Sequence, residues 1–201
     1  MDVNLIIGSK DNIPQLANNL SKQDIAFLIS QLNEKNDEIR YPSFLILQQR
    51  SRFFADVYPY WDTLAEKLEN ENSYQRSIGI MLLAENIRWD NEKRFAKIFE
   101  SFMSHSSDEK FITSRQTIQS IAQWAEFVPE LLPRVVEILT GINVSSLKDT
   151  QRKLILLDII NALLTVRKVR QFDEIDAFIS SALTGGILDK KSIKQIEGLM
   201  K

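Results

Sequence analysis

An arginine that recurs at a near-constant interval is the feature that most constrains this fold. Arg40, Arg76, Arg115 and Arg152 follow one another at steps of 36, 39 and 37 residues. Each arginine precedes an apolar run with helical spacing, such as residues 44–47 after Arg40. A repeat of this length predicts stacked helix pairs, because one pair cannot bury both of its apolar faces alone.

Composition agrees with a helical chain. The 201 residues are 44% hydrophobic and 26% charged, which is typical of a globular protein. With Gly 6 and Pro 5, they offer too few turn residues for an all-β sandwich or barrel, and no segment reads as a strand. We therefore predict an all-α fold in a single domain that spans residues 1–201.

Polar residues mark where several of the predicted helices begin. Capping-box spacing, in which two polar side chains close the first turn of a helix, is found three times, and single caps are expected at three more helices. The boxes are Ser21–Asp24, Ser106–Glu109 and Ser146–Asp149, and the single caps are Asn36, Asp56 and Asp90. Together with short polar connections, these signals predict about five antiparallel helix pairs, the last formed by residues 172–183 and 187–200.

The second helix of the predicted pairs carries a motif that resembles the HEAT-repeat family. In this family the helix opens with Asp, an aliphatic residue followed by Arg, and then a small residue, which Asp37, Ile39, Arg40 and Ser43 match. Other copies match in part, namely Arg76 with Gly79, Asp149 with Arg152, and Arg115, where Ile112 replaces the acidic residue. The resemblance covers about residues 20–170. Tetratricopeptide repeats are the nearest alternative, but their period of about 34 residues is shorter and their Trp-Leu-Gly-Tyr pattern is absent.

The resemblance implies a right-handed α-α superhelix with a concave surface lined by the second helix of each pair. The family's motif positions are structural and carry no activity of their own. We therefore expect each recurrent arginine to pair with a carboxylate at a neighbouring helix start, although a basic ladder for an acidic peptide or a nucleic-acid backbone is the alternative. The structural positions are Asp37, Arg40, Arg76, Arg115, Asp149 and Arg152.

Polar stripes on the second helices are the candidate binding residues. Their spacing places them on one face of each helix, where the concave surface is expected. Such a face can hydrogen-bond to a partner protein, and a plain solvated face is the competing interpretation. The candidates are Gln48, Gln49, Arg52, Glu85, Arg88, Gln116, Gln119, Gln123, Glu126, Asp158 and Asn161.

Asp158 allows a sharper hypothesis, because apolar residues flank it on both sides in the sequence. A partly desolvated carboxylate can take part in proton or cation chemistry. HEAT-like alkylpurine DNA glycosylases use a carboxylate and aromatic residues around the lesion, and Trp89 and Trp124 are the possible aromatics here. The formal net charge of −2 argues against a nucleic-acid partner. An outward polar residue of an amphipathic helix is the competing interpretation of Asp158.

Other sites are weakly supported. The aromatic stretch from Arg52 to Trp61 fits either a partner-binding hot spot or, more commonly, the packing between helices. His105 is the sole histidine and the chain has no cysteine, so neither a conventional His/Cys zinc site nor a disulfide is expected. No phosphate-binding loop or catalytic triad is recognisable. The sequence therefore predicts no enzyme activity, no cofactor and no metal.

Three functional hypotheses follow. The leading one is a non-catalytic scaffold or adaptor that binds a protein partner on the concave surface. The second is a DNA-binding, glycosylase-like protein, and the third is a structural protein that self-assembles through its end, residues 187–200. We expect a cytoplasmic protein with no membrane partner, because no window approaches a membrane span in length. The sequence leaves the identity of the partner and the oligomeric state open.

Overall fold

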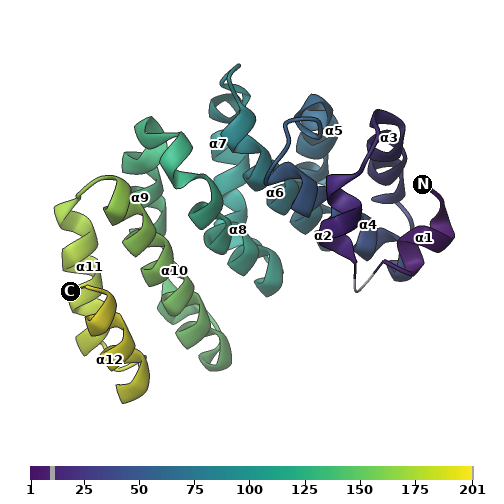
Figure 1. Ribbon diagram of the computed structural model, residues 1–201. Coiled ribbons are helices and arrows are strands. Elements are labelled where there is room, and N and C mark those ends of the chain that lie inside the picture. Colours follow the sequence, from purple (N-terminus) through teal and green to yellow (C-terminus); the bar gives the residue numbers. More distant parts are fainter. Residues whose placement is uncertain (10–11, 201) are drawn as a thin grey trace. The chain divides into compact units, whose positions relative to one another are not determined.

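The computed structural model describes residues 1–9 and 12–200. Within these ranges every regular element is a helix and no strand is present, which confirms the predicted all-α class (Figure 1). The α-helices are α1 (Val3–Ile7), α2 (Ile13–Asn18), α3 (Lys22–Gln31), α4 (Asp37–Ser51), α5 (Trp61–Ala65), α6 (Ser73–Asn86), α7 (Arg94–Ser104), α8 (Phe111–Trp124), α9 (Leu132–Thr140), α10 (Asp149–Val169), α11 (Asp173–Thr184) and α12 (Lys190–Leu199). Short 3-10 helices extend or connect them: η1 (Tyr58–Tyr60), η2 (Glu66–Glu69), η3 (Ile87–Trp89), η4 (His105–Ser107), η5 (Ala125–Phe127), η6 (Pro129–Leu131) and η7 (Val144–Ser146).

The chain forms two compact units. Unit 1 runs from Met1 to Phe102 and unit 2 from Met103 to Lys201, so the boundary falls inside α7. Each unit buries its own set of apolar side chains. The expectation of one domain over residues 1–201 stays a prediction.

Unit 1 contains two helix pairs that meet through their second helices. The first pair is α3 with α4, and in the second pair α5 and η2 pack against α6. Helix α4 contacts α6, while α1 and α2 pack against α4. The buried core includes Leu28, Leu47, Trp61 and Ile80, which come from α3, α4, α5 and α6.

Side-chain caps in unit 1 follow the sequence signals closely. Ser21 and Asp24 form the predicted capping box at the start of α3. The Asn36 side chain accepts a hydrogen bond from the backbone N–H of Glu38 at 3.0 Å, as predicted for α4. Asp90 accepts from the N–H groups of Arg94 and Phe95 at 2.9 and 2.7 Å, which satisfies donors at the start of α7.

The predicted cap at Asp56 is wrong. Its carboxylate binds the guanidinium group of Arg50 instead, with Nη2–Oδ2 at 2.6 Å and Nε–Oδ1 at 3.1 Å. Arg50 is 7% exposed and also donates to the carbonyl oxygens of Ala17 and Asn18. A buried guanidinium needs a charged partner and acceptors for its other donors. Asp56 therefore neutralises Arg50 of α4 and does not cap the next helix.

Unit 2 is organised around the longest helix, α10. Helix α8 packs along α10, and α9 and α11 also contact α10 and each other. The buried core includes Ile121 and Trp124 of α8, Leu139 of α9, and Ile159 and Leu163 of α10. The C-cap of α9 is Gly141.

Two predicted capping boxes in unit 2 are wrong. The N-caps of α8 and α10 are Lys110 and Lys148, and neither makes a side-chain cap hydrogen bond. The Ser146 hydroxyl donates to the carbonyl of Asn143, and Ser106 belongs to η4. Short 3-10 turns precede both helices, so α8 begins four residues and α10 begins two residues beyond the start that the predicted box implies.

Candidate partner-binding surface

Three of the recurrent arginines donate hydrogen bonds to backbone carbonyls in the loop that precedes their own helix. Arg40 donates to the carbonyl of Glu34, and Arg152 donates to the carbonyls of Leu147 and Ser145 at 2.9 and 2.8 Å. Arg76 donates in the same way to the carbonyls of Asn70 and Glu71, both at 2.9 Å. Because these oxygens lie in the loop before the helix, the arginines hold the two helices of a pair together.

Arg40 and Arg152 each pair with a carboxylate at the start of their own helix, and not of a neighbouring helix as expected. Arg40 forms an ion pair with Asp37, and Arg152 Nη1 lies 2.6 Å from Oδ1 of Asp149. The carboxylates are 75% and 88% exposed, so the ion pairs add little stability beyond the loop contacts. The recurrent arginines at these positions therefore have structural contacts, which agrees with the structural interpretation of the repeat.

Arg115 departs from this pattern. The hydroxyl of Ser114, its neighbour in sequence, donates to the loop carbonyl of Ser106 at 2.6 Å. Arg115 instead binds Asp158 on α10, with Nε–Oδ2 at 2.5 Å and Nη2–Oδ1 at 3.2 Å. The amide of Gln119 donates to Oδ1 of the same carboxylate at 2.9 Å. The hydrogen bond with Asp158 raises the pKa of Arg115 further above its usual range.

Asp158 is therefore not an outward polar residue of an amphipathic helix, which was the competing interpretation. Its side chain is 9% exposed, and both of its oxygens accept hydrogen bonds from α8. The carboxylate joins α8 to α10 in the interior of unit 2. Trp124, one of the two aromatic residues suggested for it, is fully buried in the same core and is not accessible to a ligand.

The other predicted residues of unit 2 extend from this cluster along α8, the 3-10 helix η5 that follows it, and α10. Gln119, Glu126 and Asn161 are exposed, and Gln116 and Gln123 are half-buried. We call the predicted residues of these helices the α8–α10 face. The face is rich in amide groups, and its central carboxylate is neutralised by one arginine.

The predicted residues of unit 1 meet around another buried carboxylate. Glu85 of α6 has a side chain that is 2% exposed, and its Oε1 lies 3.1 Å from Nε of Arg52 at the end of α4. Its Oε2 lies 3.4 Å from Nη2 of Arg88 in η3. Arg88 also donates to the backbone carbonyl of Arg52 at 3.0 Å, and Trp89 donates from its indole N–H to the carbonyl of Ser51 at 2.7 Å. These contacts satisfy carbonyl groups at the C-terminal end of α4.

Between Tyr41 and the end of α4, and between Tyr74 and Met81 of α6, the remaining outward positions are apolar or neutral. On α4, Tyr41 is exposed and Leu45, Gln48 and Gln49 are half-buried, while the other residues from Pro42 to Ser51 are buried. On α6, Tyr74 is exposed and Met81 is half-buried. We call these residues, together with Arg52, Glu85 and Arg88, the α4–α6 face. It is aromatic where the helices begin and carries two arginines where they end.

The aromatic part of this face was not predicted from the sequence. Tyr41 is 57% exposed and Tyr74 is 67% exposed, and the guanidinium of Arg40 lies 5.4 Å from the Tyr74 ring centroid. A signal was available, because Tyr41 lies on the same helical stripe as Gln48 and Arg52. The aromatic stretch named as a possible hot spot is divided, since Trp61 is buried in the core and Phe53 is exposed.

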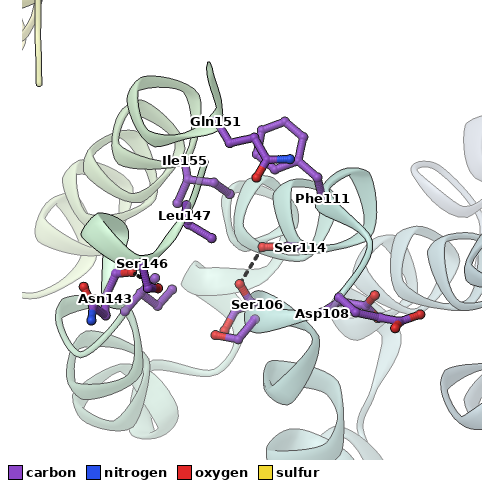
Figure 2. Close-up of a pocket in the computed structure, with 12 residues that line it drawn as sticks. Ser106, Asp108, Phe111, Ser114, Asn143, Ser146, Leu147, Gln151 and Ile155 are labelled. Carbon is purple, nitrogen blue, oxygen red and sulfur yellow. Dashed lines mark hydrogen bonds between the residues drawn. The ribbon is translucent and has the colours of Figure 1, made fainter. Parts of the chain in front are cut away.

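Unit 2 also contains a cleft that the sequence did not reveal. Its volume is about 330 Å³, and it lies between the loops that precede α8 and α10 (Figure 2). Its walls include Phe111, Leu147 and Ile155, and its charged lining groups are Asp108 and Glu109.

Asp108, a lining residue of the cleft, fixes the loop that leads into α8. The Asp108 carboxylate contacts Nδ1 of His105 at 3.1 Å and accepts from the backbone N–H of Lys110 at 2.8 Å, which orders the loop. Residues 1–9 and 12–200 contain no group of three or more His, Cys, Asp or Glu side chains that could hold a metal ion. No helix in these ranges is long and apolar enough to cross a membrane.

Comparison with known proteins gives a likeness in fold alone. No family model matches the chain, and no curated protein matches it. An engineered protein solved by the Northeast Structural Genomics Consortium is similar in structure, with a TM-score of 0.60 and 13% identity over 98% of this chain and 91% of the engineered one. A second engineered protein from the same consortium has a TM-score of 0.46 and 12% identity over 98% and 93% of the two chains.

Proposed function

We propose that this protein is a non-catalytic scaffold or adaptor that binds a protein partner on the outward faces of its second helices. The observation that supports the proposal is the α4–α6 face, where two exposed tyrosines and two arginines surround a half-buried middle. Tyrosine and arginine are over-represented among the residues that dominate protein–protein affinity, whereas a merely solvated face has no need of exposed aromatic rings. The α8–α10 face adds amide groups that can bind a partner's backbone or polar side chains.

A HEAT-like arrangement is part of the proposal. About five helix pairs stack in a right-handed superhelix, which places the second helices on one continuous inner surface. Small-angle X-ray scattering tests this arrangement, because a solenoid is more extended than a compact globule of equal length. We expect a radius of gyration above the value of about 16.5 Å for a compact globule of this length. A value at or below it contradicts the superhelix.

Partner capture from the source cell tests the function. We expect Tyr41→Ala combined with Tyr74→Ala to abolish capture of a protein that the wild type retains, because the substitutions remove the two largest exposed groups of the face. The matched control combines Thr63→Ala with Glu66→Ala, two exposed positions on α5 and η2. Both double variants should unfold close to the wild-type temperature. Retention of the same protein by the tyrosine variant would place its binding site elsewhere.

The alternatives lack an observation that favours them. In the DNA-binding hypothesis Asp158 must be available to a nucleotide, whereas its oxygens bind Arg115 and Gln119. For self-assembly through residues 187–200, the exposed apolar group within this segment is Leu199, which is 55% exposed. One such side chain is too small an apolar patch to support a stable interface.

A further inference from the structure

The cleft of unit 2, between the loops that precede α8 and α10, is large enough for a small organic ligand. Its volume of about 330 Å³ is more than twice the volume of about 150 Å³ at which a cavity in a protein core holds one benzene ring. The volume also falls at the lower end of the range of about 300–1,000 Å³ that small-molecule sites occupy. The cleft therefore has room for about two fused rings.

Apolar side chains form both walls of the cleft. Figure 2 shows Leu147 and Ile155 on one side and Phe111 on the other, and Ile142 also belongs to the lining. A flat ring placed between these walls buries apolar surface on both of its faces, and contact with the Phe111 ring adds an aromatic pair. The walls thus favour a planar apolar ligand over a branched polar one.

The charged groups of the lining already have partners in the protein. The Asp108 carboxylate contacts Nδ1 of His105 at 3.1 Å and accepts from the backbone N–H of Lys110 at 2.8 Å. Oε1 of Glu109 lies 3.3 Å from Nζ of Lys110. A charged ligand would lose hydration on entering the cleft without meeting a lining charge that lacks a partner. An uncharged ligand avoids this cost.

One buried hydroxyl in the lining lacks a hydrogen bond. The Ser114 and Ser146 hydroxyls donate to the carbonyls of Ser106 and Asn143 at 2.6 and 2.7 Å. Ser106 itself is 2% exposed, and its hydroxyl has no hydrogen-bond partner within the part of the chain that the structure describes. The half-buried amide of Gln151 has none there either. Because a buried hydroxyl without a partner is costly, a ligand that supplies one gains affinity.

We propose that this cleft binds an uncharged, planar ligand of about two fused rings, with the rings between Phe111, Leu147 and Ile155 and one polar group hydrogen-bonded to the Ser106 hydroxyl. A hydroxyl both donates and accepts, and so does the Gln151 amide, so the polar group of the ligand is an N–H, a hydroxyl or a carbonyl. The cleft shares no residue with the α4–α6 face or the α8–α10 face, so this site is independent of the proposed function. A free small molecule and a tryptophan side chain of a partner present the same chemistry.

An NMR titration of the ¹⁵N-labelled full chain with indole tests the proposal. We expect a dissociation constant below about 1 mM, with the largest shifts at amides of the cleft such as Ser106, Phe111 and Ile155. N-methylindole lacks the donor and should bind about three- to ten-fold more weakly, as expected for the loss of one hydrogen bond. Indole-5-carboxylate and tryptamine carry a charge and should each bind at least about ten-fold more weakly.

Substitution of Ser106 identifies the polar group responsible. Ser106→Ala should remove the difference in affinity between indole and N-methylindole, because both ligands then lack the hydroxyl contact. The variant should fold as the wild type does, since the hydroxyl has no partner within the described residues. Ser145→Ala is the matched control, at an exposed position outside the lining, and should leave the difference unchanged. Thermal unfolding checks that both variants are folded.

Four outcomes overturn the proposal: no shifts at about 5 mM indole, shifts outside the cleft, tighter binding of either charged probe, or a preference for indole that survives Ser106→Ala. If Ser106→Ala does not fold, the ranking of the four probes on the wild type and the location of the shifts still decide. N-acetyltryptophanamide separates the two sources of the ligand. Tighter binding than indole supports a partner's tryptophan, and weaker binding supports a free small molecule.

Discussion

Lys67 is a cation held in the interior of unit 1. The residue is 6% exposed, and its Nζ donates to Oδ1 of Asn33 at 2.7 Å and to Oε1 of Gln75 at 2.5 Å. Burial, with a smaller contribution from the charge of Arg40, lowers the pKa of Lys67 to about 8. Neutral amide oxygens bind the ammonium group without supplying a full counter-charge, so the folded protein binds this proton more weakly than the unfolded chain does.

This difference predicts how stability changes with pH. Between about pH 8 and the ordinary lysine value of about 10.4, the unfolded chain holds a proton that the folded protein has released, so stability rises with pH. We expect the free energy of unfolding of the wild type, relative to Lys67→Met, to increase by about 1–2 kcal/mol between about pH 7 and about pH 9.5. Urea unfolding at both pH values measures it.

The pH range of this prediction ends at about pH 9.5 because the ionisation of Tyr58 changes the free energy of unfolding in the opposite direction. Burial and the hydrogen bond to Asp90 raise the pKa of Tyr58 above its usual range. At higher pH the unfolded tyrosine ionises first and stability falls again. A difference between wild type and Lys67→Met that does not change with pH would show that Lys67 has an ordinary pKa in the folded protein.

Arg115 and Asp158 predict an asymmetric response to substitution. The Asp158 side chain is 9% exposed and the Arg115 side chain is 26% exposed, so a carboxylate left alone is more poorly solvated than a guanidinium left alone. We expect Arg115→Met to lower the free energy of unfolding by about 2–3 kcal/mol and Asp158→Asn by about 1–2 kcal/mol. Chemical denaturation of both variants and of the double variant gives the two costs and their coupling. A larger cost for Asp158→Asn would contradict the burial argument.

At the scale of the element, the close approach of α5 and η2 to α6 depends on a glycine. A Cβ at Gly79 would lie 2.9 Å from the carbonyl oxygen of Leu64 and 2.9 Å from Cβ of Lys67. The first neighbour is backbone, so the helices must separate to admit a methyl group. This contact is the physical reason for the small residue in the second copy of the repeat motif.

Gly79→Ala should therefore be destabilising despite the better helix propensity of alanine. We expect a loss of about 1–3 kcal/mol in the free energy of unfolding, as for other overpacked sites. Gly198→Ala in α12 is the matched control, because nothing lies within 4 Å of a Cβ at that position. The control should be neutral or stabilising by up to about 1 kcal/mol. Thermal unfolding of the two variants tests this prediction. Equal stabilities of the Gly79→Ala and Gly198→Ala variants would show that α6 can move away from α5 and η2 without a cost in free energy.

Helices were more predictable from sequence than the contacts between them. The caps at Ser21, Asn36 and Asp90 were predictable because each cap side chain and the backbone N–H that donates to it lie within a few residues of each other. The boxes before α8 and α10 failed because their residues form 3-10 turns, which compete locally for the same backbone donors.

Pairing across elements explains the rest of what was missed. The partner of Arg50 is Asp56, and the partners of Asp158 come from α8, about 40 positions away in the sequence. Spacing indicates which face of a helix a residue occupies, but it does not indicate which neighbouring side chain meets it there. The candidate residues were therefore predicted as polar stripes on single helices. The buried carboxylates and exposed tyrosines of the two faces could be identified only in the structure.

At the scale of the whole molecule, charge argues against nucleic acid as the partner. The 25 Lys and Arg residues are outnumbered by 27 Asp and Glu residues, which gives the formal net charge of −2. Proteins that bind DNA through its backbone neutralise several phosphates, and their affinity falls by orders of magnitude between about 50 and about 200 mM salt. Neither the α4–α6 face nor the α8–α10 face offers such a row of cations.

We therefore expect no tight binding to DNA, even at low salt. The measurement is a fluorescence titration of a labelled duplex that contains an abasic-site analogue, at about 50 and about 200 mM salt, with protein up to about 10 μM. A flat signal at low salt agrees with a protein partner. Submicromolar binding that collapses at the higher salt would contradict this expectation. Arg52→Gln and Asp158→Asn would then separate the two faces, because the first removes a surface cation and the second changes the carboxylate that the glycosylase hypothesis requires.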